Sequence, residues 1–102
     1  MNKFRIIIFS DPKDFINSLD KSRRAKVDKI YYLFEDYGFY LPGKYLKKLT
    51  KLVWELRPGD VRLLLHVKEN VGYIVHAFLK KTQKTSKRDL KLAVDRIKRE
   101  VL

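Results

Sequence analysis

Hydrophobic and polar positions alternate with different periods along the chain, and each period predicts a different kind of element. Residues 3–9 (KFRIIIF) are rich in β-branched and aromatic side chains, which favours a strand. The Ser-Asp-Pro run that follows is typical of a helix start, with Pro12 in the first helical turn. We therefore expect a short helix over residues 12–19.

A longer helix is predicted over residues 21–37. Its apolar side chains recur at i, i+3, i+4 and i+7 on one face: Val27, Ile30, Tyr31 and Phe34. Gly38 suits the end of this helix. Residues 39–51 (FYLPGKYLKKLTK) contain a Pro-Gly pair that breaks any helix, so they are predicted to form a loop with at most a short turn.

The second half of the chain predicts three strands and a final helix. The strands span residues 51–56, 61–68 and 72–79, and the links RPGD and KENVG between them are typical of hairpin turns. The helix is predicted over 87–102, with Ser86 and Asp89 forming a capping box in which Asp replaces the usual Glu. An apolar stripe on it is expected to pack on the sheet: Leu90, Ala93, Val94, Ile97 and Val101.

The predicted order is strand, helix, helix, strand, strand, strand, helix, within one domain over residues 1–102. This order is typical of an α+β domain with a mostly antiparallel sheet and its helices packed on one face. The opposite face of the sheet would then be partly free to bind something.

Alternation along the strands indicates which side chains share a face. Arg62, Leu64 and His66 fall on one face of the 61–68 strand, and its remaining residues are aliphatic apart from Lys68. The 72–79 strand leaves both of its faces as candidates for burial. We expect the open face to carry these basic residues, with neighbours from the adjoining loops: Arg57, Arg62, His66, His76, Lys80, Lys81 and Lys84.

Composition excludes several kinds of site. The 102 residues include no Cys, so disulfides, thiol catalysis and cysteine-based zinc sites are excluded. Neither of the two His has another His or a Cys at metal-ligand spacing, and no metal is expected. The sequence has no apolar run of membrane-spanning length and no pattern typical of a signal peptide, so we expect a cytoplasmic protein with no membrane contact.

The net charge of +12 indicates a polyanionic partner, and nucleic acid is the commonest one in a cytoplasm. The charge is uneven: residues 63–79 are neutral overall, whereas residues 80–102 carry nine basic and three acidic side chains. A surface kept only for solubility would not need this distribution. The chemistry of the residues alone leaves open whether such a domain cleaves nucleic acid or only binds it.

Two stretches resemble a known superfamily: KYLKKLTKLVWELRPGDVRLLL and YIVHAFLKKTQKTSKRDLKLAVDRIK. Their WELR segment, the Arg opening the next strand, and the HxFxKKTxKT run before a helix with A…R resemble the RelE/ParE toxin superfamily. Within it they are most similar to the HigB branch, which includes phage-derived toxin-like proteins. The resemblance implies a type II toxin–antitoxin toxin that uses no metal or cofactor and cuts mRNA, usually in the ribosomal A site.

The resemblance also implies a mechanism and a protein partner. The 2′-hydroxyl of the RNA attacks the adjacent phosphate and leaves a 2′,3′-cyclic phosphate, and an antitoxin silences the enzyme. For this branch a helix-turn-helix antitoxin is expected.

Site residues follow from the resemblance position by position. Arg57 and Arg62 match residues that grip the scissile phosphate, and Lys81 matches a position tied to transition-state stabilisation or leaving-group protonation. Glu55 stands where some relatives carry a Lys that acts as base, although pairing with Arg57 is an equal alternative. His76 is a candidate acid or base. The Tyr near the start of the last helix of RelE has no counterpart in KTSKRD.

A second group of basic residues is expected to contact RNA phosphates without reading sequence. It consists of Lys47, Lys48, Lys51, Lys80, Lys84, Lys87, Arg88 and Lys91. Three other functions remain open: a ParE-like toxin that inhibits gyrase, a non-enzymatic module that binds nucleic acid, and a degenerate toxin kept only as an antitoxin partner.

Overall fold

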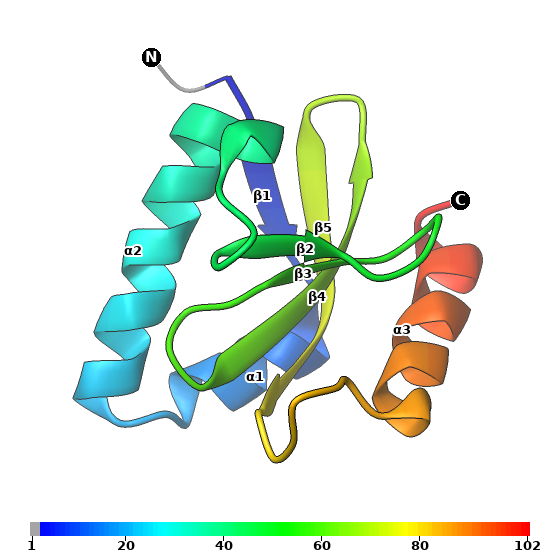
Figure 1. Cartoon of the computed structure of the whole chain (residues 1–102). Helices are drawn as coiled ribbons and strands as arrows, with labels where there is room; N and C mark the ends of the chain where they lie inside the picture. Colours follow the sequence, from blue (N-terminus) through cyan, green and yellow to red (C-terminus); the bar gives the residue numbers. More distant parts are fainter. Residues whose placement is uncertain (1–2) are drawn as a thin grey trace.

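The computed structural model describes residues 3–102, which form one five-stranded sheet with helices on either side (Figure 1). The strand order is β1-β5-β4-β3-β2. The elements in chain order are β1 (Arg5–Ile8), α1 (Ser10–Asn17), α2 (Lys21–Tyr37), the 3₁₀ turn η1 (Gly38–Tyr40), β2 (Leu46–Lys48), β3 (Trp54–Leu56), β4 (Val61–Lys68), β5 (Val71–Leu79) and α3 (Lys87–Glu100). The predicted α+β class and mostly antiparallel sheet are confirmed.

The sheet is antiparallel except at one edge. β1 pairs with β5 in parallel, and every other neighbouring pair is antiparallel. The register between β4 and β5 shifts at Leu64 and Leu65, because Leu64 lies opposite His76 and Leu65 lies opposite Ile74. Val75 is therefore a bulged residue, and the alternation of faces along β5 is broken at that point.

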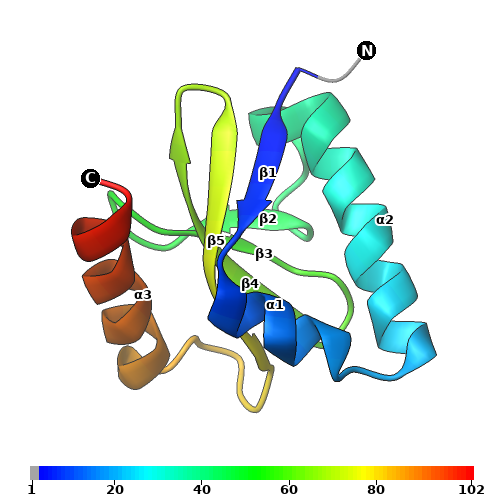
Figure 2. The ribbon, with the colours of Figure 1, turned by 180° about the vertical axis from the view of Figure 1, so that it is seen from behind.

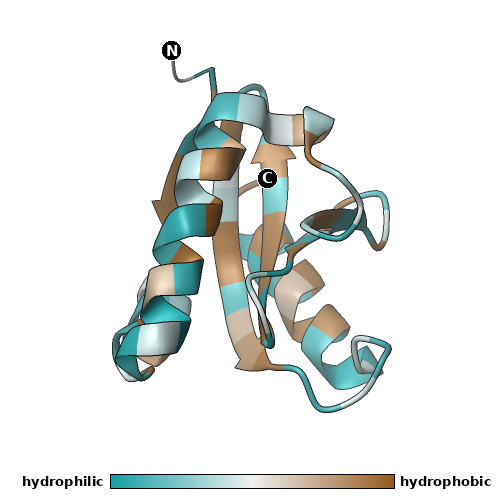
Figure 3. Cartoon of the chain, turned by 60° about the vertical axis from the view of Figure 1, so that its left-hand side comes forward, coloured by the Kyte–Doolittle hydropathy of each residue, from teal (hydrophilic) through white to brown (hydrophobic). Residues whose placement is uncertain are grey.

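The helices cover both faces of the sheet, and the expectation that all lie on one face is wrong. α1 and α2 pack on one face, over Leu63, Leu65 and Ile74, whereas α3 packs on the other, over Leu64 and Val75 (Figure 2). Figure 3 shows the hydrophobic strands between helices whose outer surfaces are hydrophilic. The prediction failed because Leu64 and Val75 extend the apolar surface of the sheet to its second face.

The segment predicted as a loop over residues 39–51 contains β2, and the strand predicted over 51–56 begins only at Trp54. A turn separates the two strands. In it the Thr50 hydroxyl accepts hydrogen bonds from the backbone N–H groups of Leu52 and Val53, both at 3.2 Å. A threonine side chain competes in this way with strand pairing of the backbone.

The predicted cap is found at the start of α3, whereas α1 spans Ser10–Asn17, begins after Phe9 and has no side-chain cap. Ser86 Oγ accepts a hydrogen bond from Asp89 N at 3.1 Å, which confirms Ser86 as the cap of α3. The Asp89 carboxylate accepts from the Ser86 hydroxyl at 2.6 Å and not from the Ser86 backbone N–H, so the second bond of the predicted capping box is not formed. Within α3, Arg96 donates to the carbonyl of the bulged Val75 at 2.7 Å and to the carboxylate of Asp11 at 2.6 Å. This side chain therefore joins α3 to β5 and α1.

Among residues 3–102, no helix combines the length and hydropathy needed to cross a membrane.

The Gly38→Ala variant should be strongly destabilised. Gly38 ends α2 with φ +49°, and a Cβ there would overlap the ring of Phe4. The strained backbone and the overlap together should lower the free energy of unfolding by about 3 kcal/mol, measured by urea denaturation. Gly43→Ala is the control, because no heavy atom of the described residues beyond its two chain neighbours lies within 4 Å of its Cβ position, and it should change stability by about 0.5 kcal/mol or less. Equal urea midpoints for the two variants would show that neither the positive φ nor the contact with Phe4 makes glycine necessary at position 38.

Candidate functional site

A cavity of about 680 Å³ lies between the α3-facing side of the sheet, the start of α3 and the connecting loop over residues 80–86. We call it the cationic cleft. Its charged lining residues are Glu55, Arg62, Lys80, Lys81, Lys84, Arg88 and Asp89. Within residues 3–102 no three His, Cys, Asp or Glu side chains cluster so that they could hold a metal ion. The cleft thus offers mainly cations, which suits a phosphate-bearing ligand.

Glu55 lies beneath the cleft and is 1% exposed. Its Oε1 accepts a hydrogen bond from Arg57 Nε at 2.8 Å and lies 3.9 Å from Arg62 Nε. Its Oε2 accepts a hydrogen bond from the hydroxyl of Thr85. A buried carboxylate needs such partners, because burial without them would be very costly. The ion pair with Arg57, one of the two alternatives for this residue, is therefore observed.

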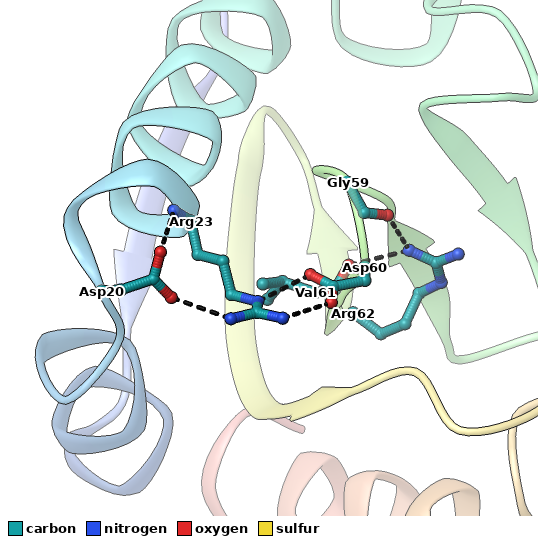
Figure 4. Close-up of polar contacts among 6 residues, drawn as sticks. All are labelled: Asp20, Arg23, Gly59, Asp60, Val61 and Arg62. Atoms are coloured by element: carbon teal, nitrogen blue, oxygen red, sulfur yellow. Dashed lines mark hydrogen bonds and ion pairs between the residues drawn. The ribbon is translucent and has the colours of Figure 1, made fainter.

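Arg62 lies on the floor of the cleft, opposite Phe78 in the sheet register. Its side chain is 12% exposed, and Nη1 donates to the carbonyls of Gly59 at 2.8 Å and Val61 at 2.9 Å (Figure 4). Burial lowers the pKa of Arg62, the negative charge of Glu55 opposes this and the positive charge of Arg57 adds to it. The ordinary pKa of arginine is so high that the group stays protonated at neutral pH.

His76 forms a pair with Asp89 at the wall of the cleft. His76 Nε2 lies 2.7 Å from Asp89 Oδ1, and Ser86 Oγ donates to Asp89 Oδ2 at 2.6 Å. Burial raises the pKa of Asp89, but the hydrogen bonds from Ser86 and His76 outweigh it and leave the pKa below its ordinary value. An ionised Asp89 accepts a hydrogen bond from Nε2–H of a neutral ring, and Nδ1 of that tautomer is then the free acceptor.

Lysines surround the mouth of the cleft. Lys80, Lys81 and Lys84 are exposed and line the cavity, and none of them forms an ion pair with a residue in the described part of the chain. Arg88, at the start of α3, faces the same space. Within residues 3–102 these four cations have no carboxylate partner, so they form a concentrated positive field at one opening.

The other predicted basic residues do not line this cavity. Lys47 is opposite Glu55 in the sheet register and so shares its face. Lys48 lies over the Trp54 ring, 5.5 Å from its centre, and therefore on the opposite face. Lys91 is paired with Asp95 at 2.9 Å. Lys51, in the β2–β3 turn, and Lys87, the first residue of α3, are exposed.

His66 does not join the cleft, contrary to expectation. Its Nδ1 lies 2.7 Å from the carbonyl oxygen of Leu52, so the ring is held against the β2–β3 turn.

Three other residues of the site were not identified as site residues from the sequence. Asp89 was identified only as a cap, Thr85 lies 30 positions from its partner Glu55, and Phe78 stacks on the His76 ring at 5.4 Å. No local sequence signal reports the contacts of Thr85 and Asp89, whereas Phe78 lies two residues from His76 in β5, and alternation along the strand could have placed it in the site.

The Glu55→Gln variant should be destabilised because it removes the buried negative charge that faces two arginines. We expect the free energy of unfolding to fall by about 3 kcal/mol, as measured by chemical denaturation. Asp95→Asn is the matched control, because its pair with Lys91 is exposed and should contribute less than about 1 kcal/mol. A Glu55→Gln variant as stable as this control would show that the buried ion pair contributes little.

The Ser86→Ala variant should raise the pKa of Asp89, because the Ser86 hydroxyl is the largest influence that lowers it. The measurement is a carboxyl-carbon NMR titration, with Ser22→Ala on α2 as control. The depressed pKa of Asp89 contributes stability that is fully present above the unfolded pKa of about 3.9. That stability is lost as pH falls through the folded pKa. An unmoved Asp89 midpoint in Ser86→Ala would overturn this account.

Solved structures with the same fold include two RelE proteins. A free-state mutant of E. coli toxin RelE aligns with a TM-score of 0.66 and 17% identity, over 95% of this chain and 99% of that one. RelE in an archaeal RelE–RelB complex from Pyrococcus horikoshii OT3 aligns with a TM-score of 0.63 and 19% identity, over 76% of this chain and 94% of that one. At these identities the likeness establishes the fold.

Sequence comparison places the chain in a family. No curated protein sequence matches it significantly. The family model described as phage-derived protein Gp49-like (DUF891) matches residues 14–98, which include the whole of the cationic cleft. This match confirms the suspected phage-derived branch, and the fold that the chain shares with RelE agrees with the suspected RelE/ParE superfamily. The chain belongs to the phage-derived Gp49-like family.

Proposed function

We propose that this protein is the toxin of a type II toxin–antitoxin pair and acts as a metal-independent endoribonuclease on mRNA bound to the ribosome. The observation that carries the proposal is the cationic cleft, in which Arg62 forms the floor and three unpaired lysines form the rim. The RelE-like fold and the Gp49-like family support the choice of a toxin over other basic domains.

Cleavage by the 2′-hydroxyl makes three demands. A base must take the hydroxyl proton as the oxygen attacks phosphorus, cations must offset the charge that develops on the phosphorane, and an acid must protonate the departing 5′-oxygen. Water is not consumed in this step, and the products are a 2′,3′-cyclic phosphate and a 5′-hydroxyl. The cleft has candidates for all three demands.

Arg62 and Lys81 are assigned to the phosphate. Arg62 is held by the Gly59 and Val61 carbonyls at Nη1, which leaves other N–H groups of its guanidinium for phosphate oxygens. Lys81 is exposed at the cleft mouth, where it would neutralise the phosphorane and protonate the leaving oxygen. Lys80 and Lys84 would contact neighbouring phosphates.

His76 is assigned as the base. Asp89 accepts from its Nε2 and so leaves Nδ1 to take the 2′-hydroxyl proton, and the carboxylate stabilises the imidazolium that results. Glu55 is too deeply buried to meet RNA, and both of its oxygens already accept hydrogen bonds. Its proposed role is to hold Arg57 and Arg62 in place beneath the phosphate.

The proposed partners are an antitoxin and the ribosome. One of the structures with this fold is RelE in complex with RelB, and a comparable antitoxin, of the helix-turn-helix type, would bind here. Lys47, Lys51, Lys87 and Arg88 would steer the protein toward RNA phosphates. mRNA and ribosomes place its action in the cytoplasm.

Arg62→Ala should abolish mRNA cleavage. Wild type and variant are induced in cells that lack any antitoxin, and primer extension maps the 5′ ends of a translated mRNA. We expect new ends within the reading frame for the wild type and a fall of about 100-fold or more in their abundance for Arg62→Ala, because the phosphorane loses its nearest buried cation. Arg24→Ala, which removes an exposed charge on α2, is the control and should cleave like wild type.

Growth arrest with intact mRNA would contradict the proposal and favour a gyrase-type toxin. Neither arrest nor cleavage would favour a binding module or an inactive toxin.

A further inference from the structure

The β3–β4 turn at Pro58–Asp60 lies between α2 and the cationic cleft. Arg23 of α2 forms an ion pair with this turn. Arg23 Nε donates to Asp60 Oδ1 at 2.9 Å and Nη2 donates to Oδ2 at 2.7 Å, a two-pronged pair (Figure 4). These hydrogen bonds hold the pKa of Asp60 below its ordinary value. A two-pronged pair of this kind fixes the relative orientation of the two side chains as well as the distance between them.

The guanidinium of Arg23 is itself fixed by its own helix. Nη1 donates to Asp20 Oδ1 at 2.9 Å, and the other oxygen of Asp20 accepts from the Arg23 backbone N–H at 3.2 Å as the cap of α2. The side chain therefore spans from a helix cap to the turn, with three of its nitrogens engaged.

The same turn makes two further hydrogen bonds on its other side. The Gly59 carbonyl accepts from Arg62 Nη1 at 2.8 Å, and the Asp60 carbonyl accepts from the backbone N–H of Lys80 at 2.7 Å. One of these bonds sets the direction of the cation on the cleft floor. The other fixes the point where β5 ends and the lysine-bearing loop begins.

We propose that Arg23 is a positioning residue for RNA cleavage, which acts through the Asp60 side chain and the β3–β4 turn on Arg62 and Lys80. The inference rests on the proposed function for its catalytic consequence. Arg23 touches no part of the cleft, so its effect would be to hold the turn and, through it, the two cleft groups. A small displacement of a phosphate-binding cation is enough to slow such a reaction.

Stability alone would not explain this arrangement. Arg23 and Asp60 are both more than one-third exposed, and exposed ion pairs contribute little to the free energy of folding. A purely structural role therefore predicts small and similar effects of Arg23→Ala and of Arg24→Ala, which removes an equal charge from the same helix. A positioning role predicts that only Arg23→Ala slows the chemical step.

The kinetic test uses single-turnover cleavage of mRNA on programmed ribosomes with the full chain. Arg23→Ala should lower the cleavage rate at saturating enzyme about tenfold, while its affinity for the ribosome matches that of Arg24→Ala. Arg23→Lys should recover only part of the rate, because an ammonium keeps the charge but cannot form the fork. Equal rates for Arg23→Ala and Arg24→Ala would overturn the proposal.

A second measurement is independent of activity. In Arg23→Ala the NMR signal of Arg62 Nε–H should shift, and the Lys80 amide should exchange with solvent about tenfold faster or more, with both unchanged in Arg24→Ala. Unchanged signals in Arg23→Ala would overturn the proposal. If wild type cleaves no RNA the proposed function fails, and these signals still decide whether Arg23 holds the two cleft groups. Should Arg23→Ala fail to fold, Asp60→Asn weakens the same fork with minimal change of shape, and the same outcomes apply.

Discussion

The buried carboxylate of Glu55 is the constraint on which the site depends. A negative charge that is 1% exposed is tolerable only if cations and hydrogen-bond donors surround it. Arg57 comes from the end of β3, Arg62 from β4 and Thr85 from the loop before α3. One side chain thereby ties the loop before α3 to the paired strands β3 and β4, and it keeps two guanidinium groups together despite their mutual repulsion.

The β-bulge at Val75 explains why apolar and reactive side chains share one sheet face. Regular alternation along β5 would put His76 on the same side as Ile74, in the core beneath α1 and α2. The extra residue moves His76 to the face that carries Arg62 and Leu64, while Ile74 and Ala77 remain in that core. The bulge thus permits a packed core on one side and the His76–Asp89 pair on the other.

Local patterns predicted the elements well because they depend on neighbours in the chain. The N-terminal cap of α3, the long helix α2 and the two hairpin strands follow from periodicity and turn residues. β2 was missed because three residues beside a Pro-Gly pair carry too little pattern, and they form a strand only by pairing with β3. The basic residues of the cleft followed from composition and resemblance, whereas Asp89 entered the site only through tertiary folding.

The lysines at the cleft mouth lower the stability of the folded protein. Lys80, Lys81, Lys84 and Arg88 bring positive charges together above Arg62, and the repulsion between them disfavours the folded state. Packing alone would be served as well by neutral polar residues, because these side chains are exposed. The loop that carries three of them is nevertheless held at both ends, by the Asp60 carbonyl at Lys80 and by Glu55 at Thr85. Holding like charges together in this way is reasonable only where a polyanion relieves the repulsion, and the same repulsion would then become part of the binding energy for the RNA proposed as its ligand.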